Sequence, residues 1–327
     1  MMRILVTGAS GFVGGRLLER LAQNRSLQLF ALQRYVTGRD DLSPPQASEA
    51  SPKLAFCDLR DPAAVKSAVR EIQPEVVIHL ASISPVSYSY DHPNEVMDVN
   101  LSGTINLAES CRRENPSLKH FLFASTSETY GNGPVPKRED TPQSPNSPYS
   151  VSKLAAEKYL LYMWQASKFP VTVLRAFNTY GRRDSSDYLV ERMIVQMLRG
   201  DVVRLGDPAP ARDLLHIDDH VDAYLACLSN SQASIGEIFN FCTGEKLTVG
   251  SLAEKLRDMT GFRGRIQWNT IPPRPLDIQV MYGDPAKAKS VLGWQPKVKL
   301  EAGLSQTIDF WRKKLAGPDH ASRATPP

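Results

Sequence analysis

The feature that most constrains the fold lies at the start of the chain, where a short apolar run gives way to three glycines and then to a helical pattern. Residues 3–6 form a β-branched run, whereas Leu17, Leu18 and Leu21 recur at helical spacing. A strand followed by a glycine turn and a helix is a typical opening of a sheet whose strands run parallel. The start of the chain therefore predicts an α/β fold.

The alternation of strand and helix patterns continues along the first half of the chain. Apolar runs lie at 27–32, 54–57, 76–81, 121–124 and 171–177, and helical patterns lie at 63–72, 95–113 and 150–167. Fully apolar strands joined through helices imply a parallel sheet that is covered on both faces. We predict a doubly wound parallel sheet of the Rossmann type.

Beyond residue 178 the pattern changes, because helical stretches alternate with segments rich in turn residues. This predicts a smaller C-terminal α/β cap that binds substrate. The predicted division is a dinucleotide-binding Rossmann domain at 1–177 with a later contribution from about 213–243, an interleaved cap at 178–315, a mobile surface loop at 38–52 and a disordered tail at 316–327.

Composition and charge argue against several classes of protein. The 327 residues are 42% hydrophobic, which suits a large core, and the net charge of +4 comes from scattered basic residues, which disfavours nucleic acid. No window is apolar for long enough to span a bilayer, and no signal-peptide arrangement opens the chain, so we expect no membrane partner and a cytoplasmic location. The cysteines are far apart, which predicts buried reduced thiols and no metal site: Cys57, Cys111, Cys227 and Cys242.

The three glycines near the start have the G-x-x-G-x-x-G spacing of a dinucleotide site. The first permits a tight turn, the second lets the backbone approach a pyrophosphate, and the third allows close packing of the helix. The helix after this loop presents free amide groups to the phosphates. The predicted cofactor contacts in this loop are Gly8, Ser10, Gly11, Phe12, Val13 and Gly14.

The choice between NAD and NADP depends on the residues at the end of the second strand. NAD sites usually carry an acidic residue there, whereas this chain has Gln33 and Arg34. An arginine pairs well with a 2′-phosphate, so NADP is the predicted cofactor. NAD stays possible if Asp40 or Asp41 reaches the ribose. Weaker cofactor signals end the next two strands, at Asp58, Leu59, Leu80, Ala81 and Ser82.

Tyr149 and Lys153 stand four residues apart at a predicted helix start, so their side chains share one face. An ammonium beside a phenol favours the phenolate, which predicts a lowered tyrosine pKa and a base that takes the proton of a sugar hydroxyl. The alternative is an ordinary surface pair. The position after a glycine loop and five predicted strands favours the catalytic interpretation.

Several ordered motifs together resemble the extended short-chain dehydrogenases/reductases that act on nucleotide sugars. They are TGASGFVG (7–14), STSETYG (125–131), SPYSVSK (147–153), LRAFNTYG (174–181), RDLLHIDD (212–219) and RPLDIQVMYGDPAKAKSVLGW (274–294). The resemblance implies that Thr126 bonds the sugar 4-hydroxyl, that Tyr149 is the base and that Lys153 supports the tyrosine and the nicotinamide ribose.

The same resemblance places substrate contacts in the cap. It implies that Ser84, Asn178, Arg212 and Arg274 hold the nucleotide sugar, the arginines through charge-assisted bonds to its diphosphate. For Arg212 the alternative is an ion pair with its neighbour Asp213.

Glu128 separates the reactions known in this family. Members that remove water place an acid pair or a single glutamate after the threonine; oxidation at carbon 4 acidifies the carbon 5 proton, water then leaves carbon 6, and hydride returns there. Glu128 thus favours a 4,6-dehydratase, resembling most those for GDP-mannose and for legionaminic acid precursors. Ser127 replaces the aspartate of dTDP-glucose dehydratases, so either Ser127 or Glu128 protonates the leaving hydroxyl.

Other interpretations keep the fold. In a nucleotide-sugar 4-epimerase or a 4-keto-sugar reductase Glu128 would be a bystander, and NDP-uronate decarboxylases carry Tyr-Asp-Glu where this chain has Tyr149, Ser150 and Val151. A non-catalytic nucleotide-binding regulator is disfavoured by the intact Thr126 and Lys153.

The helices at 95–113 and 150–167 carry apolar residues on more than one face, and an extra apolar face usually buries a partner. In the family these helices form a dimer contact, so we expect a homodimer. The residues that suggest the extra face are Val96, Val99, Ile105, Leu107, Leu154, Leu160, Leu161 and Trp164.

Overall fold

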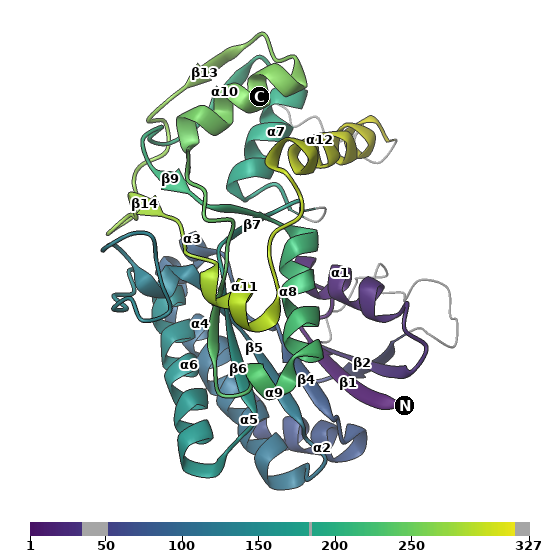
Figure 1. The fold of residues 1–327 in the computed structure, drawn as a ribbon. Coiled ribbons are helices and arrows are strands. Elements are labelled where there is room, and N and C mark those ends of the chain that lie inside the picture. The colour runs from purple at the N-terminus through teal and green to yellow at the C-terminus, as the bar shows by residue number, and fades with distance from the viewer. Residues whose placement is uncertain (35–51, 183–184, 318–327) are drawn as a thin grey trace.

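The computed structural model describes residues 1–34, 52–182 and 185–317 (Figure 1). Most of the predicted loop at 38–52 and most of the predicted tail at 316–327 lie outside these residues, and so do Asp40 and Asp41.

A seven-stranded sheet forms the base of the molecule, with the strand order β11-β6-β5-β4-β1-β2-β3. Every neighbouring pair is parallel, and the order reverses at β1 and β4, as in a doubly wound fold. The predicted fold class is confirmed. The strands are β1 (Met2–Thr7), β2 (Leu27–Gln33), β3 (Lys53–Phe56), β4 (Val76–His79), β5 (His120–Thr126), β6 (Val171–Ala176) and β11 (Ile238–Phe241).

Helices cover both faces of this sheet. Alternate strand residues point to opposite faces, so neighbouring residues of one strand pack against different helices. Ile4 and Val6 share one buried cluster with residues of α1 and α8, whereas Leu5 belongs to a second cluster with α2, α5 and α6. The covering helices are α1 (Phe12–Leu21) and α8 (Ile217–Ser229) on one face, and α2 (Pro62–Ile72), α5 (Gly103–Glu114) and α6 (Pro148–Ser167) on the other.

The single helix predicted at 95–113 is a composite. It consists of α4 (Pro93–Met97), a π-helical turn (Asp98–Ser102) and α5. The wider turn carries the buried Asn100, whose amide oxygen accepts a hydrogen bond from the Ile83 nitrogen at 2.8 Å and whose amide nitrogen donates to the Ile83 carbonyl at 3.1 Å. This side chain joins the helix to the loop after β4, a contact that apolar periodicity does not report.

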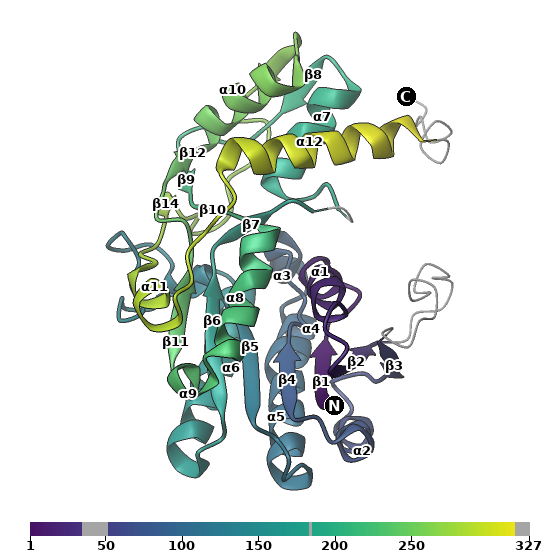
Figure 2. The ribbon, with the colours of Figure 1, turned by 45° about the vertical axis from the view of Figure 1, so that its right-hand side comes forward.

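A smaller layer lies over the end of the sheet where β1, β4 and β5 terminate (Figure 2). Its own buried cluster includes Met193, Ile194, Leu252 and Trp311. Its elements are β7 (Asn178–Tyr180), α7 (Leu189–Arg199), β8 (Val202–Arg204), β9 (Ala211–Arg212), β10 (Leu214–His216), β12 (Leu247–Thr248), α10 (Val249–Thr260), β13 (Arg265–Gln267), β14 (Val280–Met281) and α12 (Leu300–Ala316), with the short helices α3 (Val86–Asp91), α9 (Ser231–Ser234) and α11 (Ala286–Leu292) elsewhere.

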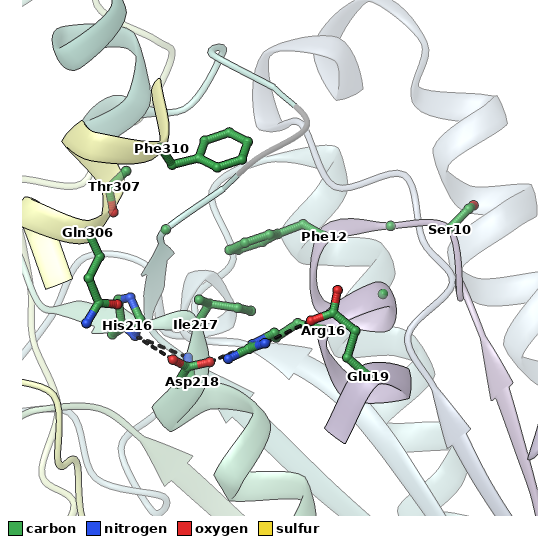
Figure 3. A pocket seen from close by; sticks show the side chains of 13 residues that line it. Ser10, Phe12, Arg16, Glu19, His216, Ile217, Asp218, Gln306, Thr307 and Phe310 are labelled. Atoms are coloured by element: carbon green, nitrogen blue, oxygen red, sulfur yellow. Dashed lines mark hydrogen bonds and ion pairs between the residues drawn. The ribbon is translucent and has the colours of Figure 1, made fainter. Parts of the chain in front are cut away.

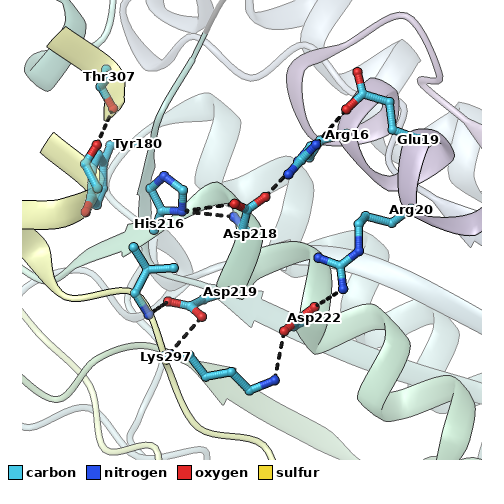
Figure 4. Close-up of polar contacts among 12 residues, drawn as sticks. Arg16, Glu19, Arg20, Tyr180, His216, Asp218, Asp219, Asp222, Lys297 and Thr307 are labelled. Carbon is cyan, nitrogen blue, oxygen red and sulfur yellow. Dashed lines mark hydrogen bonds and ion pairs between the residues drawn. The ribbon is translucent and has the colours of Figure 1, made fainter. Parts of the chain in front are cut away.

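Ion pairs tie α1 to α8 across the first face (Figure 4). Arg16 Nε donates to Asp218 at 2.7 Å and Arg20 to Asp222 at 2.9 Å. Asp219 holds the segment that precedes α12. Its carboxylate accepts hydrogen bonds from two backbone amides of that segment, including the amide of Lys297 at 2.9 Å. These contacts fix the start of α8 beside the glycine loop.

His79 and the four cysteines are buried in the interior of the protein. His79 lies between Thr7 (2.7 Å) and Thr104 (2.8 Å), and burial lowers its pKa to about 3, so the ring is neutral. All four cysteines are buried and none forms a disulfide bond, as predicted. Among the described residues no helix has the length and apolar character needed to cross a bilayer.

Candidate functional site

One cleft of about 1040 Å³ runs along the junction of the sheet and the cap. All the residues predicted for the site line it, although they come from nine separate parts of the sequence. They are Gly8, Ser10, Gly11, Phe12, Val13, Gly14, Arg34, Asp58, Leu59, Leu80, Ala81, Ser82, Ser84, Thr126, Ser127, Glu128, Tyr149, Lys153, Asn178, Arg212 and Arg274.

The glycine loop has the close backbone packing that its spacing predicts. Gly8 has a φ of +69°, and a Cβ there would lie 2.7 Å from the Ala81 nitrogen; a Cβ on Gly14 would lie 2.2 Å from the Gly8 oxygen. Helix α1 begins at Phe12 after Gly11, and no side chain caps its first amides. These amides can therefore donate hydrogen bonds to a bound anion.

The end of the cleft beside β2 is where the sequence predicts the ribose end of a dinucleotide. Gln33 lines it with a buried side-chain nitrogen that has no hydrogen-bond partner among the described residues, and the exposed Arg34 comes next after β2. Asp58 is bonded to Arg60 at 2.6 Å, and that bond lowers the Asp58 pKa. Unpartnered buried polar atoms are costly, so this wall is suited to a polar ligand.

Tyr149 and Lys153 occupy the first turns of α6, whose start is fixed by a capping box between Ser147 and Ser150 and by Pro148. Both side chains reach the cleft. The Lys153 ammonium lies 4.6 Å from the centre of the Phe123 ring.

The prediction that Tyr149 has a lowered pKa is wrong when only the protein's own groups act on it. Burial raises the pKa of this phenol well above its ordinary value, and a hydrogen bond with Thr126 only partly opposes the increase. Burial also lowers the pKa of Lys153 to about 7, so this amine is a weaker cation than its spacing suggested. The four-residue spacing predicted the shared face correctly, but it carries no information on loss of solvent.

Thr126 ends β5 and caps a 3₁₀ turn at Ser127–Tyr130, accepting from the Glu128 amide at 3.2 Å. The Glu128 side chain therefore lines the cleft two residues after Thr126. Burial raises the pKa of its carboxyl, while Arg212 and Arg274 oppose the increase. A carboxyl of this kind both accepts and releases a proton nearer neutral pH than an exposed glutamate does.

The cap end of the cleft holds the two predicted arginines. Arg274 donates to Asp277 at 3.1 Å, and Arg212 Nη2 lies 3.8 Å from the same carboxylate. The alternative partner Asp213 instead accepts from Thr243 at 2.7 and 2.8 Å and from the amide of Gly244. Arg212 is thus available to the cleft. Within the described part of the chain the buried side-chain oxygen of Asn178 has no hydrogen-bond partner there, and Ser84 bonds Tyr188 at 3.0 Å.

Sequence reasoning missed several polar and aromatic cleft residues, of which Arg182, Tyr188, His220 and Tyr224 are examples. The Arg182 guanidinium lies 3.4 Å from the ring centre of Tyr188 and 4.5 Å from that of Phe12. His220 and Tyr224, one turn apart on α8, line the wall with a buried ring nitrogen and a buried hydroxyl that have no partner in residues 1–34, 52–182 and 185–317. Their spacing matches an ordinary amphipathic helix, so nothing in the sequence singled them out.

A smaller cavity of about 190 Å³ lies behind the glycine loop (Figure 3). Phe12 and Phe310 close it, and Arg16 at its floor is bonded to Asp218 at 2.7 Å and to Glu19 at 2.8 Å. Its cation is already paired with two carboxylates, so we assign the candidate site to the large cleft.

Comparison with known proteins agrees with this geometry. Residues 5–307 match the family model described as GDP-mannose 4,6 dehydratase. The chain is 33% identical over 325 residues to the UDP-glucose 4-epimerase of Mycolicibacterium smegmatis, covering 96% of this chain and 99% of that one.

Solved structures give the same result. The UDP-glucose 4-epimerase of Thermus thermophilus in complex with NAD has a TM-score of 0.84 at 32% identity, covering 95% of this chain and 99% of that one. RMD of Pseudomonas aeruginosa, complexed with NADPH, has a TM-score of 0.79 at 26% identity, covering 96% and 100%. The protein therefore belongs to the extended short-chain dehydrogenase/reductase family of NAD-dependent nucleotide-sugar epimerases and dehydratases.

Proposed function

We propose that the protein is a nucleotide-sugar 4,6-dehydratase that converts an NDP-hexose into an NDP-4-keto-6-deoxy sugar. The observation that supports this most is the Glu128 carboxyl, which lines the cleft two residues after Thr126 and has a pKa raised by burial. A 4-epimerase needs no carboxyl at this position.

The residues divide the proton transfers among them. A nicotinamide dinucleotide held by the glycine loop would supply the hydride acceptor for carbon 4 and the hydride donor for carbon 6. Thr126 holds the 4-hydroxyl and Tyr149 takes its proton. Glu128 removes the carbon 5 proton and delivers a proton to the hydroxyl that leaves carbon 6 as water, with Ser127 as the alternative donor. Carbon 5 finally regains a proton that exchanges with solvent.

The cofactor contacts that we propose are Gly8, Ser10, Gly11, Phe12, Val13, Gly14, Arg34, Asp58, Leu59, Leu80, Ala81, Ser82, Tyr149 and Lys153. NADP is the proposed cofactor, because Arg34 lies at the cleft after β2 where a 2′-phosphate would need a cation. Direct comparison of Kd for the two cofactors tests this, and a clear preference for NAD would contradict it.

Substrate contacts are proposed for Ser84, Asn178, Arg212 and Arg274, with a GDP-linked hexose as the first candidate. The division into a dinucleotide domain and a cap, the homodimer and the cytoplasmic location remain predictions.

A nucleotide-sugar 4-epimerase is the second candidate. It is favoured by similarity to proteins named UDP-glucose 4-epimerase, and it uses the same Thr126, Tyr149 and Lys153 without Glu128.

Turnover of GDP-, UDP-, dTDP- and CDP-sugars in deuterium oxide separates the two candidates. A dehydratase product has lost water and gained deuterium at carbon 5, whereas an epimerase product has done neither. Glu128→Gln should abolish the loss of water, with Glu245→Gln, at an exposed position, as the matched control. Unchanged product formation by Glu128→Gln would remove the dehydratase proposal.

A further inference from the structure

A buried ion pair lies directly behind the Thr126–Glu128 segment. Glu157 of α6 and Arg175 of β6 are bonded to each other with side-chain exposures of 0% and 1%. The Glu157 carboxylate accepts from Arg175 through both nitrogens Nε and Nη2. It also accepts from Gln143 at 3.2 Å. The proposed chemistry assigns no role to either residue.

The pair holds the residue that precedes the segment. Ser125, immediately before Thr126, donates its hydroxyl to Glu157 at 2.9 Å. Ser125 and Arg175 are also register partners in the β5–β6 ladder. The end of β5 is thus joined to the ion pair through both backbone and side chain.

The same pair holds the residue that ends the turn. Arg175 Nη1 donates to the Tyr130 hydroxyl at 2.7 Å and to the Glu139 carbonyl at 3.0 Å. Tyr130 in turn donates to Asn240 of β11 at 2.7 Å, and the Arg175 guanidinium lies 4.8 Å from its ring centre. Thr126, Ser127 and Glu128 therefore lie between two anchors that meet in one ion pair.

Glu157 also shares a helix face with the catalytic pair, since Tyr149, Lys153 and Glu157 are spaced by four residues on α6. Among the described residues, the titratable groups that interact electrostatically with Lys153 are Glu157 on its own helix and His79 on β4, which is neutral. Glu157 thus supplies the negative charge near this amine, and it raises the Lys153 pKa against the effect of burial.

The stability of the folded protein does not by itself explain why such a buried ion pair is present. Taking two charges out of water is costly, and buried ion pairs can often be replaced by apolar residues without loss of stability. An ion pair that accepts or donates bonds from four segments does impose a fixed geometry, which catalysis needs because small displacements of reacting groups slow a reaction strongly.

We propose that Glu157 and Arg175 are the positioning residues of the active site: together they fix Thr126 and Glu128 against Tyr149. The inference rests on the proposed roles of Thr126, Tyr149 and Lys153. It does not rest on Glu128 acting as a base, so it holds for a dehydratase or an epimerase.

The test compares the double variant Glu157→Gln/Arg175→Met, which removes both charges at once, with Ser125→Ala and Tyr130→Phe, which each remove one anchor. The exposed cap pair Lys255→Met/Glu301→Gln is the charge control. Measurements are kcat and KM for the nucleotide sugar, and the titration of Lys153 followed by NMR of ¹³C-labelled lysine.

We expect kcat of the double variant to fall about 10- to 100-fold with KM unchanged, and the Lys153 titration to move to lower pH. Ser125→Ala and Tyr130→Phe should lower kcat without moving that titration. A folded double variant with the wild-type kcat and titration overturns the proposal. If the double variant does not fold, unchanged kcat in both single variants overturns it.

The two proposals fail in different ways. Full activity of Tyr149→Phe would remove the proposed function. An inactive Tyr149→Phe combined with a fully active Glu157→Gln/Arg175→Met would leave the function intact and remove only the positioning role.

Discussion

At the scale of single residues, burial has the largest effect on the candidate site. It raises the pKa of Glu128 and Tyr149 and lowers that of Lys153, and in each case the neutral form is favoured. The sequence predicted which residues meet in the cleft, because their motifs come at strand ends in order. It could not predict these proton affinities, which depend on how much solvent the cap removes.

Glu128 should cost stability at neutral pH. Its pKa in the folded state is above that of the unfolded chain, so the folded state binds more protons between the two values and stability falls as pH rises through them. Glu128→Gln should therefore raise the urea midpoint at pH 8, and the gain should disappear towards pH 4. Glu245→Gln is the control, and a variant that is less stable at both pH values would contradict the prediction.

Arg274 should act on binding. It reaches the cleft beside Asp277 with 38% of its side chain exposed, and a charge-assisted bond is worth about 1.5–3 kcal/mol. Arg274→Ala should then raise KM roughly 10- to 100-fold with a much smaller change in kcat. Steady-state kinetics check this against Arg25→Ala, an exposed arginine beyond the end of α1. A fall in kcat at constant KM would exclude the arginine from the substrate site.

At the scale of elements, the long strands and helices of the sheet were predictable because each buries an uninterrupted apolar pattern. The cap strands, two or three residues long, were not, since so few residues show no periodicity. The π-helical turn at Asp98–Ser102 was also missed, because its cause is one polar side chain, Asn100, bonded to a distant loop.

Asn100→Ala should therefore destabilise the protein. The change leaves the partly buried amide and carbonyl of Ile83 without their partner, and unsatisfied buried groups cost about 1–3 kcal/mol each. Urea unfolding should show a loss of about 2 kcal/mol or more, against no change for the exposed Lys158→Ala on α6. A loss no larger than that of the control would show that the turn does not depend on this side chain.

At the scale of the whole molecule, the expected homodimer has less surface to use than the sequence suggested. Val96, Leu107 and Leu160, counted there as an extra apolar face, are completely buried in the chain's own core. The exposed hydrophobic side chains of α6 include Tyr162, which is 60% exposed, and Val151, which is 38% exposed.

For the predicted homodimer through α6, Tyr162→Arg should give a monomer, since a charge within an apolar contact between copies would be buried without a partner. Light scattering measures the mass. Val291→Arg, at a 39% exposed position on α11, is the control and should stay dimeric. A wild-type chain that already has the monomer mass would exclude the contact altogether.

The position of β11 at the edge of the sheet has a consequence for biosynthesis. This strand pairs with β6 only after about sixty intervening residues, and α8, which covers one face of the sheet, is made just before it. A ribosome that has released the first 177 residues has therefore produced a sheet with one edge unpaired and half of one face bare. Such a nascent chain would depend on chaperones until β11 emerges, and truncated forms ending before it should aggregate when expressed.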